Sequence, residues 1–106
     1  MLDITLFIGH NIGNKDALTT QDICSEVVHT LRVKSLTAMD AFGMWNGMPE
    51  TSTQIRIMGV DEAEANRIAS LVPVLASRLR QDAIHMDAKP STSVCIPASI
   101  PALEVA

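Results

Sequence analysis

The chain has 106 residues, 47% of them hydrophobic and 19% charged, and a formal net charge of -4. This length fits one domain, and the composition excludes a disordered or fibrous chain. The eight basic residues are scattered rather than gathered in a stripe, so we expect neither a nucleic acid nor an anionic membrane surface as a partner.

The amino-terminal sequence and the lack of a long apolar run favour a cytoplasmic protein. Residues 1–11 lack the basic segment and cleavage site of a secretory signal, and no apolar run approaches the roughly 18 residues of a membrane span. Cys24 and Cys95 lie far apart without metal-ligand spacing, and in a cytoplasmic protein we expect reduced structural thiols rather than a disulfide. We therefore predict a small soluble domain.

The first strand and first helix follow from simple periodicities. Residues 3–12 alternate as a strand, and turn-forming residues from His10 to Asp16 predict a loop after it. A helix is expected to begin near Thr19 or Thr20, with Asp22 in its first turn. His29 falls outside the apolar stripe and is predicted to be exposed. The stripe itself contains Ile23, Cys24, Val27, Val28 and Leu31.

Residues 36–60 are interpreted as a central hairpin. Its first run, residues 36–45, has apolar and polar residues on both faces, so the sequence does not decide which face points inward. In the second run Ile55 and Ile57 alternate with Gln54, Arg56 and Met58. Asn46-Gly47 is a turn signal, but Pro49 cannot donate to a sheet ladder. We therefore predict a loop over residues 46–50 instead of a two-residue turn.

A second helix is expected to open at Asp61, with Glu64 at the spacing of a capping box variant. Pro73 lies within its apolar pattern and predicts a kink or break. A short strand over residues 83–87 follows. The buried stripe of the helix is expected to contain Ile68, Leu71, Val72, Leu75 and Leu79.

Strand, helix, strand, strand, helix, strand is the order of these elements, and in this order residues 3–88 resemble the ferredoxin-like superfold. The resemblance is one of topology, without a family-specific motif. It implies an α+β sandwich: a four-stranded antiparallel sheet in the order 4-1-3-2, with both helices on one face. The chain then divides into a ferredoxin-like α/β domain, residues 1–88, and an apolar carboxyl-terminal arm, residues 89–106, packing on its own or a partner subunit.

This arrangement divides the strand residues between two faces. The face away from the helices is too apolar in parts to remain exposed to water and too polar to be a core, so we expect a homodimer or higher homo-oligomer with these faces back to back. The helix-facing set is Ile4, Leu6, Ile8, Ile55, Ile57, Ile84 and Met86. The open-face set is Thr5, Phe7, Gln54, Arg56, Met58, His85 and Asp87.

The open face offers one candidate catalytic group. His85 and Asp87 could move a proton while Arg56 binds a small anionic ligand, with Asp40 as a further member of this surface. The alternative is structural: Arg56 pairs with Asp40 or Asp87 across a contact between subunits, and this alternative is favoured.

Two further groups are candidate ligand-binding residues. His10, Asn11 and Asn14 lie between the first strand and the first helix, where free N–H groups could hold an anion, although a plain turn explains them better. Trp45, beside Met44 and Met48 at the hairpin tip, suits a ligand or an interface. The best metal arrangement, His10 with His85, has only Asp61 as a third ligand, so we expect no metal and no cofactor.

The sequence therefore supports two functions. The first is a homo-oligomeric binding or assembly module that uses the open sheet face and the hairpin tip, residues 44–50. The alternative is a cofactor-free small-molecule enzyme with a His85, Asp87 and Arg56 site on the sheet face. Fold analogy is the only support for the enzyme.

Overall fold

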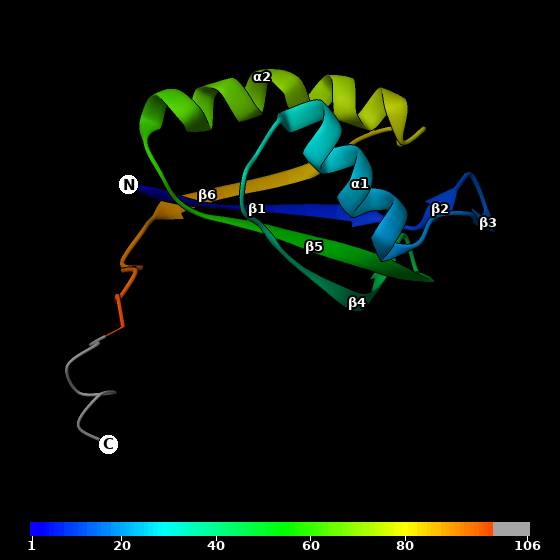
Figure 1. Ribbon diagram of the computed structural model, residues 1–106. Coiled ribbons are helices and arrows are strands. Elements are labelled where there is room, and N and C mark those ends of the chain that lie inside the picture. Colours follow the sequence, from blue (N-terminus) through cyan, green and yellow to red (C-terminus); the bar gives the residue numbers. More distant parts are fainter. Residues whose placement is uncertain (99–106) are drawn as a thin grey trace.

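The computed structural model describes residues 1–98 and has the expected architecture (Figure 1). One antiparallel sheet has the order β4-β5-β1-β6, which is 2-3-1-4 in the numbering of the four long strands and therefore the predicted order read backwards. Both helices cover the same face of this sheet, and among residues 1–98 nothing covers the other face. The strands are β1 (Leu2–Gly9), β4 (Thr37–Trp45), β5 (Met48–Val60) and β6 (His85–Pro90); the helices are α1 (Thr20–Leu31) and α2 (Glu62–Arg78).

The core lies between the sheet and the helices, and the predicted division of the strands is confirmed. Ile4, Leu6, Ile8 and Ile55 are fully buried, because alternate residues of the two central strands point at the helices. In β4 the inward face contains Ala38, which pairs with Ile55 and packs against the core. The structure thus decides which face of β4 points toward the core, which the sequence alone did not.

Helix α1 begins where its capping residues predict. Thr19 is the N-cap and its side chain accepts the N–H of Asp22, while the Asp22 carboxylate accepts the N–H of Thr19, so both halves of a capping box are present. His29 is exposed as expected. Val28 was predicted to lie in the buried stripe, but it is 49% exposed. Thr30 is buried in its place, because the stripe that faces the sheet consists of Ile23, Val27, Thr30 and Leu31.

Helix α2 begins after Asp61, whose carboxylate accepts the N–H of Glu64. A kink or break was predicted at Pro73, and the break does not occur, since the helix runs on to Arg78. Pro73 and Ala69, the residue whose carbonyl loses its partner, are both exposed, so water can satisfy that carbonyl. Ile68 and Leu75 are fully buried on either side and hold the helix on the sheet.

The hairpin between β4 and β5 differs from the prediction of a loop over residues 46–50. Trp45 pairs with Met48, and Asn46 and Gly47 form a two-residue turn with φ values of 51° and 75°. Positive φ at both positions is the condition for a type I′ turn, which Asn-Gly favours. Pro49 is tolerated because it pairs with β4 only, beyond the end of β1 at Gly9.

The segments outside the main sheet are short. β2 (Asn11–Ile12) pairs with β3 (Lys15–Asp16), so the predicted loop after β1 is a small hairpin. Beyond β6 the Ser91 N–H donates to the Met1 carbonyl, and Val94 and Ile96 are exposed. The rest of the predicted arm, residues 99–106, lies outside the described residues, and its packing stays a prediction. No helix within residues 1–98 has the length and apolar character needed to span a membrane.

Candidate functional site

The open face of the sheet carries a shallow hollow of about 370 Å³. Strand register places Arg56, Thr5 and Asp87 in one row across β5, β1 and β6, with Gln54, Phe7 and His85 in the next row. The first row lines the hollow together with Asp3 and Lys89. The register thus brings the predicted Arg56 and Asp87 into one site.

Carboxylates and cations alternate around this hollow. Asp87 lies 3.3 Å from the Lys89 ammonium. Asp3 accepts the N–H of Gly59 at 2.9 Å, and hydrogen bonds, above all from Ser91 and then from Gly59, hold the pKa of this carboxyl below its usual value. The hollow therefore presents fixed negative charge beside the exposed guanidinium of Arg56.

His85 lies next to the hollow without lining it. Its imidazole packs on the Phe7 ring, with centroids 5.3 Å apart and an interplanar angle of 60°. Both side chains reach solvent. The structure thus places His85, Asp87 and Arg56 on one face, as the sequence predicts, but nothing fixes the imidazole against a carboxylate within residues 1–98.

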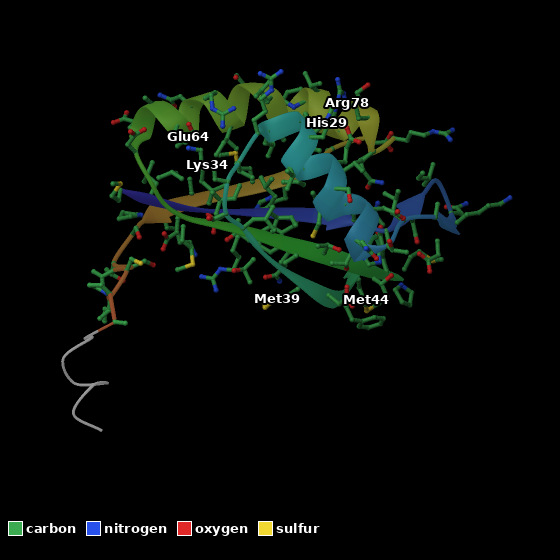
Figure 2. All side chains as sticks on the ribbon, in the orientation of Figure 1. His29, Lys34, Met39, Met44, Glu64 and Arg78 are labelled. Atoms are coloured by element: carbon green, nitrogen blue, oxygen red, sulfur yellow. The ribbon has the colours of Figure 1, made fainter. Side chains whose placement is uncertain are left out.

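Large apolar side chains are exposed along the same face and the projecting hairpin. Phe7, Met39 and Met58 belong to the open face, and Met39 is 43% exposed. At the hairpin end, Phe42, Met44 and Met48 are 67–74% exposed. Figure 2 shows Met39 and Met44 along β4, away from α2. Exposed large apolar side chains of this kind are typical of surfaces that bind a partner or a ligand.

A second cluster lies on the opposite side of the sheet, under the beginning of α1. His10 is 8% exposed, with Nδ1 3.0 Å from Thr51 Oγ1 and Nε2 2.7 Å from Thr53 Oγ1. Thr53 Oγ1 lies 2.7 Å from Thr20 Oγ1, and the Thr20 hydroxyl donates to the Asp40 carboxylate. These contacts form one chain of hydrogen bonds from a buried imidazole to an exposed carboxylate.

The carboxylate fixes the direction of every bond in this chain. Ionised Asp40 only accepts, so Thr20 donates to it and must accept from Thr53. Thr53, having donated its single proton, accepts from His10 Nε2. The neutral imidazole therefore carries its proton on Nε2, and Nδ1 accepts from the Thr51 hydroxyl. The arrangement can carry a proton between His10 and the surface at Asp40.

The threonines of this cluster were missed in the sequence, although a signal exists. Thr51 and Thr53 are in phase with Ile55 and Ile57, just as His10 is in phase with Ile8. Extending the alternation by two residues for His10 and Thr53, and by four for Thr51, places them all on the helix side of the sheet. The same phase separates Asp40 from the open face, because Asp40 pairs with Thr53 rather than with Arg56.

The other predicted ligand residues are dispersed. The Asn11 N–H donates to Glu50 at 3.3 Å and its carbonyl accepts from Gln81, so this backbone is already occupied. Asn14 is exposed at the β2–β3 turn. Trp45 ends β4, and its side chain lies outside the described part of the structure.

Metal binding and thiol chemistry gain no support from these positions. His10 and His85 lie on opposite faces of the sheet, and no group of three metal-ligating side chains occurs within residues 1–98. Both cysteines are free thiols. Partial burial raises the pKa of the Cys24 thiol, which disfavours the reactive thiolate.

The strand order, the helices on one face and the open opposite face define an α+β domain of the ferredoxin-like class. The sequence matches no protein-family model and no curated protein. The fold, however, is similar to that of solved structures. A phage SAM lyase in the apo state has a TM-score of 0.74 and 19% identity over 83% of this chain and 78% of the other.

Two further structures have the same fold. The phage SAM lyase in complex with S-methyl-5′-thioadenosine gives a TM-score of 0.73 at 18% identity, covering 83% of this chain and 79% of the lyase. A DUF3240 family protein from Shewanella baltica gives 0.57 at 10% identity, covering 92% and 97%. At these identities the similarity establishes the fold alone.

Proposed function

We propose that the chain is a homo-oligomeric binding module whose copies associate through the open sheet face and the β4–β5 hairpin. The observation that carries this proposal is the exposure of Phe7, Met39 and Met58 on the sheet face opposite α1 and α2. A second copy of the same face is the occupant we favour, because the face carries both signs of charge.

Charge complementarity supports pairing of like faces. Arg56 and Asp87 lie in the same row with Thr5 between them, and two strand spacings amount to about 10 Å. In a two-fold contact, Arg56 of each copy can therefore meet Asp87 of the other. In this proposal the structural role of Arg56 is to form an ion pair with Asp87 of the other subunit.

Sedimentation velocity over a concentration range tests the association. Phe7→Asp should shift the chain to monomer, while Val28→Asp, an equally large change at a 49% exposed position on α1, should leave the assembly unchanged. Arg56→Asp and Asp87→Arg should each weaken association, and the double exchange should restore it. A monomeric wild-type chain at all concentrations would reject the proposal.

A small-molecule enzyme is the second candidate, and the similarity to the phage SAM lyase favours it. One of those structures contains S-methyl-5′-thioadenosine. In this chain, association of open faces would enclose the hollow lined by Phe7, Arg56 and Asp87. An aromatic ring offers stacking to a nucleobase, and a carboxylate accepts hydrogen bonds from ribose hydroxyls.

Isothermal titration with S-methyl-5′-thioadenosine tests this candidate directly. Binding should be lost in Asp87→Asn and kept in Asp16→Asn, an exposed carboxylate outside the hollow. Incubation with SAM, followed by chromatography, then tests turnover. Neither binding nor conversion by the assembled protein would remove the enzyme hypothesis and leave the assembly proposal untouched.

A further inference from the structure

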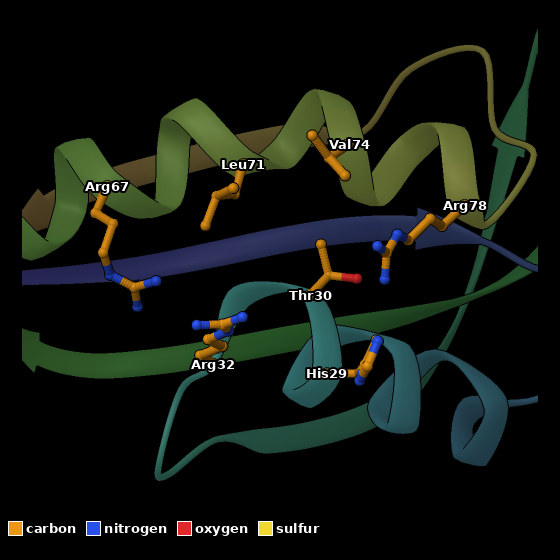
Figure 3. Close-up of a pocket in the computed structure, with 7 residues that line it drawn as sticks. All are labelled: His29, Thr30, Arg32, Arg67, Leu71, Val74 and Arg78. Carbon is orange, nitrogen blue, oxygen red and sulfur yellow. The ribbon is translucent and has the colours of Figure 1, made fainter.

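A second hollow, of about 520 Å³, lies between α1 and α2. Figure 3 shows the guanidinium groups of Arg32 and Arg67 turned toward one another at one end, with Arg78 and His29 at the other. Leu71 and Val74 form the α2 wall between the two ends. The hollow is on the helical side of the molecule, opposite the open sheet face.

Its charge differs in sign from that of the whole chain. The formal net charge is -4, yet three of the eight basic residues line this one hollow, and none of the acidic residues in the described part of the chain does. The helices bring Arg32, Arg67 and Arg78 together from positions up to 46 residues apart in sequence (78 − 32 = 46). Converging guanidinium groups are suited to bidentate binding of phosphate.

Two acidic side chains adjoin the hollow and hold its arginines in place. Arg67 donates to the Glu64 carboxylate on the same helix, and Arg78 lies 3.4 Å from Glu26 of α1. These pairs are substantially exposed and contribute little to stability, so an incoming anion can share or replace them. For Arg32, the described residues provide no ion pair within 4 Å.

The backbone of Arg32 explains how this side chain comes to point into the hollow. Arg32 is the C-cap of α1, with φ 53° and its N–H donating to the Val28 carbonyl. A left-handed cap reverses the direction of the chain at the helix end. Gly or Asn is preferred at such a position, and arginine is uncommon there. Unlike Gly or Asn, Arg32 contributes a guanidinium group to the hollow.

We infer that the α1–α2 hollow is a binding site for a small phosphorylated molecule with an apolar body. The phosphate group binds Arg32 and Arg67, and the apolar body packs on Leu71 and Val74. Because the site is on the helical side, it does not depend on the association of open sheet faces.

Nuclear magnetic resonance of the ¹⁵N-labelled full chain tests this inference with three probes at constant ionic strength. Phenyl phosphate carries both the phosphate and an apolar body. Inorganic phosphate supplies the anion alone, and benzyl alcohol supplies the apolar body alone. Phenyl phosphate should shift the Nε–H signals of Arg32 and Arg67 and the amides of Leu71 and Val74. It should bind several-fold more tightly than either other probe.

Arg32→Asn is the main variant, since Asn keeps the left-handed cap while the cation is lost. It should weaken phenyl phosphate binding about tenfold, and Arg67→Gln should do the same if the first variant unfolds. Lys15→Gln removes one charge from the exposed β3 strand and should change nothing. Equal weakening by Lys15→Gln, shifts spread over the whole surface, or equal affinity for the two phosphates would overturn the inference.

Discussion

His10 Nε2 lies 2.7 Å from Thr53 Oγ1, beneath the first turn of α1, and this bond links the buried imidazole to the Asp40 carboxylate through Thr20. The Asp40 carboxylate at the end of this hydrogen-bond network decides which group donates in each bond. Because the carboxylate can only accept, each threonine hydroxyl donates toward it. The network places a titratable side chain in the core with both ring nitrogens satisfied.

We expect the neutral His10 imidazole to carry its proton on Nε2. Two-bond ¹H–¹⁵N correlation spectra distinguish the two tautomers of neutral histidine directly. Thr53→Val should lower the free energy of unfolding by about 1 to 3 kcal/mol, because Nε2 loses its buried partner. Thr37→Val, at an exposed position of β4, is the control and should change it by less than about 0.5 kcal/mol. A proton on Nδ1 would contradict the proposed direction of the network.

The turn at Asn46-Gly47 gives a second prediction. Gly47 has φ 75°, and alanine there must adopt a conformation that L residues disfavour. Gly47→Ala should therefore destabilise the protein by about 1 kcal/mol in chemical denaturation. Gly43→Ala is the matched control, since Gly43 has no positive φ and a Cβ would meet nothing within 4 Å. Equal losses in both variants would show that the effect is not conformational.

Periodicity and capping residues predict most of this fold because they act locally. The alternation of Ile4, Leu6 and Ile8 requires one buried face, and the Thr19 and Asp22 pair defines a helix start without reference to the rest of the chain. The hairpin turn was missed for a different reason. Pro49 excludes a ladder bond only where a neighbouring strand needs one, and the end of β1 at Gly9 is not visible from residues 46–50.

The candidate sites depend more than the fold does on contacts between residues that are distant in the sequence. Arg56 and Asp87 share a row only through the register of both with Thr5. The arginines of the α1–α2 hollow come from the C-cap of α1 and from two positions of α2 that are 11 residues apart (78 − 67 = 11), and nothing in their local patterns indicates that they converge. The alternation of side chains along a strand shows which face of the sheet a residue lies on. Which surface residues of two helices meet is decided by how the helices pack, and the local sequence does not show this.

Pro73 provides a test of how much the packing of α2 tolerates. Pro73→Ala restores the missing N–H and a favourable helix residue at an exposed position, so the free energy of unfolding should rise by about 1 to 3 kcal/mol. Chemical denaturation measures this difference. Ser77→Ala, also exposed on α2, is the control and should have a much smaller effect. Destabilisation by Pro73→Ala would show that the proline relieves a strain in the packed helix.

Asp3 predicts how stability changes in acid. Hydrogen bonds from Ser91, Gly59 and Ser93 hold the folded pKa of this carboxyl below its ordinary value of 3.8. A carboxyl whose pKa is lowered by folding stabilises the folded state above the unfolded pKa, and this contribution is lost as the pH falls through 3.8 to the folded pKa. Thermal unfolding between about pH 2 and 5 should therefore show a shallower loss of Tm for Asp3→Asn than for the wild type.

The control for this experiment is Asp82→Asn, because Asp82 is an exposed carboxylate for which residues 1–98 provide no side-chain hydrogen bond. Its acid limb should follow that of the wild type. Ser91→Ala removes the largest single cause of the lowered pKa and should reproduce part of the Asp3→Asn effect without changing the carboxyl itself. Because Ser91 belongs to the segment that follows β6, this agreement would also show that the start of the carboxyl-terminal arm is fastened to β1 through Asp3. An acid limb for Asp3→Asn as steep as that of the wild type would contradict both conclusions.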